Sequence, residues 1–319
     1  LTTGGDSTIV GKDALDACVT GSQNTAIGNN ALGVYTGSGN TAVGFAALDA
    51  ATSGGTNVAV GLDALGALTT AANNCAVGHS ALVANTTGAA NTGLGTNAGL
   101  AATTAADNVF IGTSAGNIVT TGGESVYIGS AVATSNCTTG ARNVVIGRSA
   151  QASGNNGYEN VLGYGVTSAG NDRTTIGAAS TYIYTAHGTA TWTSSSDERI
   201  KKNIVDSTAG LAVINDLTTR NFNFRQHGEL PTDHPQYEKN GTEYIRKTDK
   251  LQLGFIAQEI KTVIDNHPEI AEGSGLWDEE SNGYQGIAET ALIPILVKAV
   301  QELSAEVEEL KQQLKYGRI

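Results

Sequence analysis

The sequence predicts a mainly β protein in two parts: a repetitive parallel β-roll or solenoid shaft, then a small α+β domain that ends in a coiled-coil helix. Three observations lead to this fold class. A short glycine-ended element recurs along the first half, the composition changes near residue 190, and apolar residues follow a heptad pattern at the C-terminus. A chain of 319 residues is long enough for one to three domains with buried cores.

The repeated element is a small or β-forming residue, an aliphatic residue and a glycine. Successive glycines are separated by 17, 16, 17, 17, 17, 17, 17, 18, 16 and 14 residues. The eleven glycines are Gly11, Gly28, Gly44, Gly61, Gly78, Gly95, Gly112, Gly129, Gly147, Gly163 and Gly177. Each unit is too small to bury a face alone, so neighbouring units must stack, with strands about 4.8 Å apart.

Asparagine and glycine occupy fixed places in the repeat. Seven copies place an asparagine four residues before the glycine: Asn24, Asn40, Asn57, Asn74, Asn91, Asn108 and Asn143. We expect these side-chain amides to stack at a turn, and the glycine to adopt backbone angles that other residues avoid. The residues after the glycine often contain an Ala-Leu pair, such as Ala31-Leu32, where we expect a single helical turn.

This repeat resembles the heads of trimeric autotransporter adhesins, whose left-handed parallel β-rolls use an Asn-x-Ala-Ile-Gly type of repeat. It looks closer still to the Gly/Asn repeat regions of phage tail fibres. The resemblance covers roughly residues 5–178, although the unit of mostly 17 residues is longer than the usual roll repeat. A trimeric shaft is what the resemblance implies.

Composition divides the chain. Residues 1–190 hold four basic and nine acidic residues, whereas the remaining 129 hold fourteen basic and twenty-one acidic residues and all four prolines. The sequence predicts a shaft over 1–178, a β connector over 179–193 and a C-terminal domain over 194–319. Two strands, over Thr181–Tyr184 and Thr189–Thr193, are expected to close the shaft.

Within the C-terminal domain, the polar run Ser194–Ile204 predicts a helix start or a turn. A helix is expected over Ser207–Leu217 and a strand over Asn221–Arg225. The segment Leu251–Ile260 predicts a strand that runs into a short helix, which ends before Pro268.

Three ordered motifs in this domain carry a second resemblance. They are Ser196-Asp197-Glu198-Arg199-Ile200-Lys201, the run Gly254–Glu259, and the run Leu292–Leu303 before the terminal helix. Together they resemble the intramolecular chaperone and auto-processing domain of phage endosialidases. The resemblance implies a homotrimer in which this domain assembles the preceding fibre and then cuts it. It also implies that the scissile bond is Ser195-Ser196, with Ser196 as nucleophile and Lys201 as its base.

The implied chemistry is a single-turnover self-cleavage by a serine peptidase. A serine hydroxyl is a weak nucleophile, and a lysine activates it only where burial or a nearby positive charge lowers the lysine pKa. We expect Asp197, Arg199 and Lys202 to support the dyad. By spacing alone, the same motif is also typical of an ordinary capped surface helix, because an acid after a serine often stands at a helix start.

The C-terminal helix carries an independent signal. Seven aliphatic residues step by 3 and 4 in alternation: Ile293, Leu296, Val300, Leu303, Val307, Leu310 and Leu314. This heptad pattern predicts an oligomerising coiled coil over residues 292–316. The mix of core residues by itself favours two strands, whereas the family resemblance and a shaft on the same axis favour three, so we predict a homotrimer. Pro294 fits only in the first helical turn or at a kink.

Other classes of function are disfavoured. The net charge of -12 argues against a nucleic-acid partner or an anionic membrane surface, and no apolar run reaches the ~18 residues of a membrane span. No metal site and no cofactor are expected. The three cysteines lie far apart, and no metal-ligand spacing links the five histidines, which are His79, His187, His227, His234 and His267.

The two resemblances therefore imply a phage tail fibre segment, located in the virion tail, whose released chaperone fragment stays in the host cytoplasm. A host cell-surface glycan or protein is the expected receptor, with Tyr35, Tyr127 or Tyr158 as candidate contacts. Two alternatives stay open: a surface adhesin head, or a glycan-degrading tail spike with a non-cleaving trimerisation domain. Because the sequence begins with Leu1 rather than methionine, we expect a fragment of a longer chain.

Overall fold

The computed structural model describes residues 5–16, 20–33, 35–133, 135–155, 157–189, 191–194, 196–232, 234, 236–246, 248–270, 275–279 and 283–317. The chain divides into two compact units, Leu1–Ile200 and Lys201–Ile319, and each is described by itself. The domain limits drawn from the composition stay predictions.

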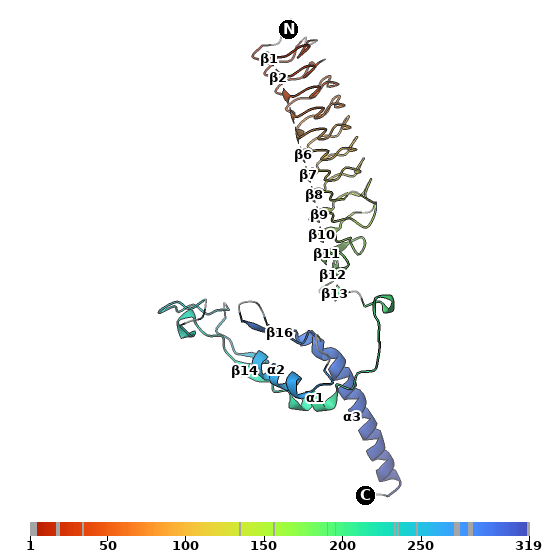
Figure 1. Cartoon of the computed structure of the whole chain (residues 1–319), viewed down its shortest axis with the longest axis vertical. Helices are drawn as coiled ribbons and strands as arrows, with labels where there is room; N and C mark the ends of the chain where they lie inside the picture. The colour runs from red at the N-terminus through yellow and green to blue at the C-terminus, as the bar shows by residue number, and fades with distance from the viewer. Residues whose placement is uncertain are drawn as a thin grey trace. The chain divides into compact units, whose positions relative to one another are not determined.

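The first unit is a parallel β-solenoid (Figure 1). Each turn contributes one three-residue strand that pairs in parallel with the next, residue for residue, as in Thr41↔Val58. The strands are β1 Thr8–Val10, β2 Thr25–Ile27, β3 Thr41–Val43, β4 Val58–Val60, β5 Cys75–Val77, β6 Thr92–Leu94, β7 Val109–Ile111, β8 Val126–Ile128, β9 Val144–Ile146 and β10 Asn160–Leu162. The solenoid predicted from the repeat is confirmed.

Longer strands end the shaft. β11 (Arg173–Ala178) continues the parallel ladder, and then β12 (Thr181–Ala186) and β13 (Thr193–Ser194) pair in the antiparallel sense. The first predicted closing strand is confirmed by β12. The second is shorter than predicted because Thr189 closes a turn, donating from its amide and its hydroxyl to the carbonyl of Ala186 (3.1 and 2.8 Å).

From β2 to β10 the shaft buries the middle residue of each strand in a narrow core, whereas Ile9 in β1 is 39% exposed. Small residues stand there in early turns, such as Ala76, and large ones later, such as Phe110 and Tyr127. Where the strand residues are large, the leucine that faces them in the core is replaced by a smaller residue. Gly116 stands at the position of the repeat that Leu82 holds two turns earlier. A Cβ at Gly116 would lie 2.4 Å from the Phe110 ring, so the glycine leaves room for the larger strand residue.

The Ala-Leu pairs do not form helical turns, and that prediction is wrong. Leu32, Leu65 and Leu82 each have φ of 53°, in the left-handed region. Their amides donate to the next turn of the solenoid, as Leu32 does to the carbonyl of Ala47 (3.0 Å). Hydrogen bonds between turns replace the bonds within a helix, and they leave the leucine side chains in the core.

The repeated glycine has the unusual backbone that its position predicted. Ten of these glycines, from Gly11 to Gly163, have φ between 121° and 140°. Each also lies against the backbone of the next copy. A Cβ on Gly78 would be 2.6 Å from the carbonyl oxygen of Gly95, closer than real Cβ atoms approach. Conformation and space both require glycine here.

The repeated asparagines form the predicted ladder. The side-chain oxygen of Asn57 accepts hydrogen bonds from the backbone amide (2.9 Å) and the side-chain amide (3.2 Å) of Asn74. The Asn57 amide nitrogen donates to the carbonyl of Ala71 (3.0 Å). Ser125 and Glu159 stand in place of asparagine in two turns, and both are buried. The ladder therefore satisfies backbone groups that face the core.

The second unit contains short helices and strands packed on one long helix. Its elements are α1 Leu211–Asp216, β14 Arg220–Phe222, η2 His227–Glu229, β15 Gln252–Gly254, α2 Ala257–Asn266, β16 Trp277–Glu279, β17 Gln285–Ile287, η3 Glu289–Ala291 and α3 Leu292–Lys315. β14 pairs with β15, and β16 pairs with β17, both in the antiparallel sense. The predicted mainly β fold class, with a small α+β second part that ends in a helix, is confirmed.

The helix expected over 207–217 is shorter, because it begins only at Leu211. The preceding Gly210 has backbone angles that are not helical (φ -148°, ψ -127°), and the amide of Leu211 donates to the carboxylate of Glu302 on α3 (2.7 Å). A core formed by residues such as Val213, Ile260 and Ile295 lies between the three helices. Pro294 stands in the first turn of α3, as predicted. Within the described residues, no helix is both long and apolar enough to cross a bilayer.

Candidate processing site and oligomerisation helix

The motif around Ser196 forms a short turn of 3₁₀-helix, η1 (Glu198–Ile200). Asp197 stands just before it, and its carboxylate oxygen Oδ1 accepts a hydrogen bond from the backbone amide of Arg199 (2.8 Å). This is the side-chain-to-backbone contact of a capping residue. The capped surface turn, one of the two interpretations of the motif, is therefore present, with Asp197 as the capping residue.

Arg199 also binds Asp197 through its side chain. Its Nε lies 2.9 Å from Oδ1 and its Nη2 lies 2.6 Å from Oδ2, which makes the pair bidentate. The guanidinium lowers the pKa of the Asp197 carboxyl, and the carboxylate raises the pKa of Arg199. In this state the charge of Arg199 is directed at Asp197. Because the Arg199 side chain is 86% exposed, solvent screens the pair, and little free energy is needed to part it.

The predicted dyad falls at the division between the two units. Ser196 belongs to the first and Lys201 to the second, and both are exposed, as is Lys202. Ser195, the other residue of the predicted scissile bond, lies outside the described residues. The roles of Ser196, Lys201 and Lys202 remain predictions.

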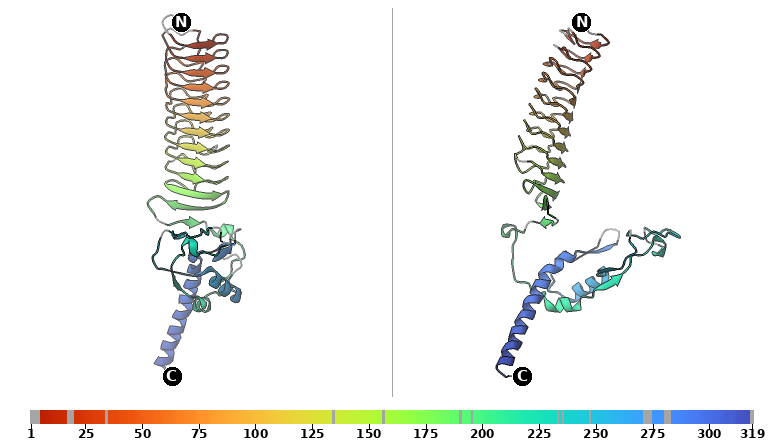
Figure 2. Two further views of the ribbon diagram at one scale, coloured as in Figure 1. Left: turned by 90° about the vertical axis from the view of Figure 1, so that its left-hand side faces the viewer. Right: turned by 180° about the vertical axis from the view of Figure 1, so that it is seen from behind.

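α3 has two different faces. Near its N-terminus Leu292, Ile295 and Ala299 are buried against the second unit's core. Glu302 binds the start of α1, as described above. Beyond Glu302, every described residue is exposed except Gln313, which is half-buried. Figure 2 shows this C-terminal part of α3 extending away from α1 and α2. In about half of α3, therefore, no described residue is fully buried by contacts within the chain.

The seven heptad residues lie on the exposed side of α3, and each is between 44% and 67% exposed. They are Ile293, Leu296, Val300, Leu303, Val307, Leu310 and Leu314. Leaving a continuous apolar row of this length in water is costly, so such rows usually mark an interaction surface. The placement agrees with a helix whose apolar seam is meant for other helices.

The sequence interpretation missed four apolar residues that the second unit also exposes. Ile204 and Val205 are 66% and 85% exposed, and Leu251 and Leu253 are 65% and 74% exposed. The leucines flank the first residue of β15, where alternation should have placed one face outward. Exposed apolar residues at several sites suit a domain that is completed by further chains.

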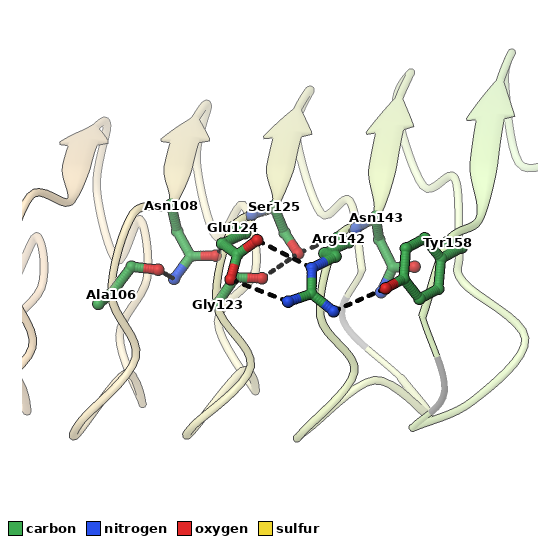
Figure 3. A network of polar contacts seen from close by, with 8 residues as sticks. All are labelled: Ala106, Asn108, Gly123, Glu124, Ser125, Arg142, Asn143 and Tyr158. Carbon is green, nitrogen blue, oxygen red and sulfur yellow. Dashed lines mark hydrogen bonds and ion pairs between the residues drawn. The ribbon is translucent and has the colours of Figure 1, made fainter.

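Two of the three receptor candidates are wrong, because Tyr35 and Tyr127 are fully buried in the shaft core. Tyr158 is 52% exposed, and its hydroxyl accepts a hydrogen bond from Arg142 (2.7 Å). Arg142 in turn binds the carboxylate of Glu124 (2.8 Å), so three successive turns are linked along one edge of the shaft (Figure 3). Only Tyr158 of the three remains accessible to a receptor.

The comparison with protein families concerns the region from Ser196 to His267. Residues 196–267 match the family model described as chaperone of endosialidase. This part of the chain is similar to chaperone-of-endosialidase domains. With the β-solenoid shaft, it fits a tail fibre, and the resemblance identified from the sequence is confirmed. The domain supports a chaperone and trimerisation role, and the family implies assembly of the chain with itself. No curated protein and no solved structure matches the chain.

The limits of the match are informative. It begins at Ser196, covers α1, β14, β15 and α2, and ends at His267. The first two of the three motifs therefore lie inside the matched region, whereas the third, on α3, lies outside it.

Proposed function

We propose that this chain is a segment of a phage tail fibre whose chaperone-of-endosialidase domain assembles three copies and then cuts itself free at Ser195-Ser196. The observation that carries the proposal is the start of the family match at Ser196. A domain that is released by cleavage before its first residue begins at that residue. The serine that the motif singles out as nucleophile is thus the first residue of the matched region.

The proposed reaction is an N-to-O acyl shift followed by hydrolysis. Ser196 Oγ attacks the carbonyl carbon of Ser195 while the Lys201 amine takes the hydroxyl proton. The peptide C–N bond breaks, the α-amine of Ser196 takes up a proton, and an ester now joins Ser195 to Ser196 Oγ. Water hydrolyses the ester, which leaves a carboxylate on Ser195 and a free amine and hydroxyl on Ser196.

Assembly is the proposed control on this reaction. In the single chain Ser196 and Lys201 are exposed to water, and a lysine acts as a base only in drier surroundings. Packing of three chains around the motif would remove water from it. It would also compete for Arg199, whose exposed pair with Asp197 is weak. Arg199 would then be available, with Lys202, to stabilise the oxyanion.

The proposed assembly is a homotrimer through α3. Three copies of the exposed heptad row bury one another, and the same three chains also build the shaft. The assembled shaft belongs to the virion tail, and the released fragment stays in the host cytoplasm. Host recognition by a surface glycan or protein belongs to the same proposal, with Tyr158 as the accessible candidate.

The test is the mass of the purified chain beside a Ser196→Ala variant. The unchanged chain should yield two products, residues 1–195 and 196–319, whereas Ser196→Ala should remain whole. Lys201→Arg keeps the charge but not the base, so it should also stay whole. Ser304→Ala, on the exposed side of α3, is the matched control and should be cut normally. Equal, intact masses for the unchanged chain and Ser196→Ala would remove the cleavage claim.

A further inference from the structure

One border of the shaft carries a column of exposed residues with a left-handed backbone. Each of them stands two positions before a strand, and their φ angles lie between 56° and 63°. The members of this left-handed column are Asp6, Gln23, Thr56, Asn73, Ala90, Asp107, Glu124, Arg142 and Tyr158. In the turn before β3 the same position is Gly39, which also has a positive φ.

Two bulky residues stand in this column without a local reason. The left-handed region is strained for most residues, and glycine, asparagine and aspartate tolerate it best. Gly39, Asn73 and Asp107 follow that preference, whereas Arg142 and Tyr158 do not. Both side chains are exposed, so the core does not require them. Strain kept at exposed side chains points to a function for those side chains.

Polar side chains gather at the start of β10 and β11, next along the chain from Tyr158. The first strand position holds threonine, valine or cysteine in β1 to β9, but Asn160 in β10. Its amide Nδ2 donates to the hydroxyl of Thr174 (3.2 Å), and Nε2 of the exposed His187 lies 3.2 Å from the same hydroxyl. Asparagine is uncommon in strands. An amide, a hydroxyl and an imidazole are therefore brought together where valine or threonine would complete the sheet.

The Tyr158 ring is held in place beside this cluster's strand. Arg142 Nη1 donates to the Tyr158 hydroxyl (2.7 Å), and the guanidinium carbon lies 5.3 Å from the ring centroid. Arg142 is itself fixed by Glu124, as Figure 3 shows. The ring nevertheless stays 52% exposed. A ligand would therefore meet an aromatic surface that is already oriented, which lowers the entropy cost of binding.

We propose that Arg142, Tyr158, Asn160, Thr174 and His187, which we call the Tyr158 border, bind a neutral oligosaccharide. The inference rests on the proposed host recognition, and it adds the site and the class of ligand. A sugar ring has a face of C–H groups and a rim of hydroxyls. A flat tyrosine ring suits the face, and amide, hydroxyl and imidazole groups can donate to the rim hydroxyls or accept from them.

The charges of this border favour a neutral sugar over an acidic one. The charge of Arg142 is paired with Glu124 (2.8 Å), and Arg173 binds the carbonyl of Ala169 (2.6 Å). Asp172 is exposed one turn after Tyr158, since Thr174 pairs with Asn160 in the parallel ladder. A carboxylate on the ligand would be repelled by Asp172.

An exposed site of this kind binds one sugar segment weakly. The proposed homotrimer presents three copies of the Tyr158 border, so several weak contacts with one glycan-covered surface act together. We therefore expect stronger binding to a dense surface of the sugar than to the free sugar in solution.

Binding of the full chain to immobilised oligosaccharides tests the ligand class. The neutral probes are oligomers of glucose, mannose, galactose and N-acetylglucosamine, and the acidic probes are polysialic acid and oligogalacturonate. At least one neutral probe should bind, and it should bind more tightly than either acidic probe.

Two variants test the site with residues that the repeat itself uses. Tyr158→Asn places asparagine where Asn73 stands, and Asn160→Val places valine where Val144 stands, so both shafts should fold. Each change should weaken binding of the best neutral probe by about tenfold or more. Phe45→Ser removes another exposed aromatic ring, just after Gly44, and should leave binding unchanged.

The native mass and the cleavage of the same samples separate this inference from the proposed function. A chain that forms particles of three and is cut at Ser195-Ser196, but binds no neutral probe, would overturn the inference and leave assembly and cleavage standing. Tighter binding of an acidic probe, or an equal loss in Phe45→Ser, would also overturn it. Particles of one chain whose neutral-probe binding is lost in Tyr158→Asn would remove the self-assembly and support the site.

Discussion

The shaft and helix α3 both present an aliphatic row to solvent, but they differ in what lies behind it. Behind the outward-facing strand residues of the shaft lie buried strand residues, the asparagine ladder and hydrogen bonds between turns, all within one chain. Behind the C-terminal half of α3 no described residue is buried. The shaft is therefore stabilised by repetition along its own sequence, whereas we expect the C-terminal half of α3 to be stabilised by contacts with other chains.

The largest effect should follow from a change at the repeated glycine. Gly78→Ala forces a Cβ to within 2.6 Å of the backbone of the next turn, at a φ of 139°. Strain and overpacking together should cost about 3 kcal/mol or more in the free energy of unfolding. Chemical denaturation of the shaft measures the change. Gly154→Ala is the matched control, because a Cβ there meets nothing within 4 Å, and its denaturation should be almost unchanged.

The next largest effect concerns association through α3. Leu310→Ala removes an exposed side chain that is buried only in the assembly, so it should weaken association by about 2–3 kcal/mol per helix. The circular dichroism of the shaft in an assembled sample should stay the same. Sedimentation measures the loss of association. Glu309→Ala, beside it on α3, should associate normally, and an equal loss in both variants would mean that the heptad row is not the contact.

A smaller effect is expected at the asparagine ladder. Asn74→Ala removes the acceptor of two hydrogen bonds from Asn91 and the donor to the carbonyl of Gly88 (3.0 Å). Leaving these buried groups without partners should cost about 2 kcal/mol. The control is Asn29→Ala, at a half-buried residue outside the ladder. It should lower the free energy of unfolding by only a few tenths of a kcal/mol, as a surface substitution does. Thermal unfolding of the two variants would show whether the ladder stabilises the shaft or only fills its turn.

The smallest effect concerns pH in the second unit. His267 binds Asp216 through Nε2 (2.8 Å) and Glu269 through Nδ1 (2.7 Å), and these contacts raise the pKa of His267 above 6.5. The contribution of His267 to the free energy of unfolding is complete below pH 6.5 and is lost as the pH rises through the folded-state pKa. His267 lowers the pKa of Glu269. The contribution of Glu269 to the free energy of unfolding is therefore lost as the pH falls below 4.5, the ordinary pKa of a glutamate.

The second unit should therefore unfold about 1–3 °C higher at pH 6 than at pH 8, a small shift because solvent screens the cluster. The fluorescence of Trp277 reports on this unit in a Trp192→Phe background. His267→Gln should remove the difference between the two pH values. A difference that persists in His267→Gln would assign it to other groups.

Much of the fold was predictable because it repeats. Eleven glycines and seven asparagines gave the strand positions, the solenoid and the ladder, since each local choice is copied from turn to turn. The left-handed leucines were not predictable, because their φ is imposed by hydrogen bonds between turns and contradicts the local preference of Ala-Leu. The start of α1 was also missed, since Glu302, 91 positions further along the chain, sets it.

The candidate site was predictable to a different degree. The motif from Ser196 to Lys201 was recognised as a unit, and the family match begins at its first residue. Its geometry did not follow from the sequence, because the bidentate contact of Arg199 with Asp197 is only one of several local pairings. The burial of Tyr35 and Tyr127 was missed because aromatic residues in a roll can face either way.

The native mass of the Ser196→Ala chain tests the central claim most directly, since this variant keeps both units in one polypeptide. The account predicts particles of three times the chain mass of 32.5 kDa, and their reduction to single chains when Leu303 and Leu310 are both changed to Asp. Particles of one chain for Ser196→Ala itself would contradict it, because α3 would then stay exposed along its apolar row and the second unit would assemble nothing.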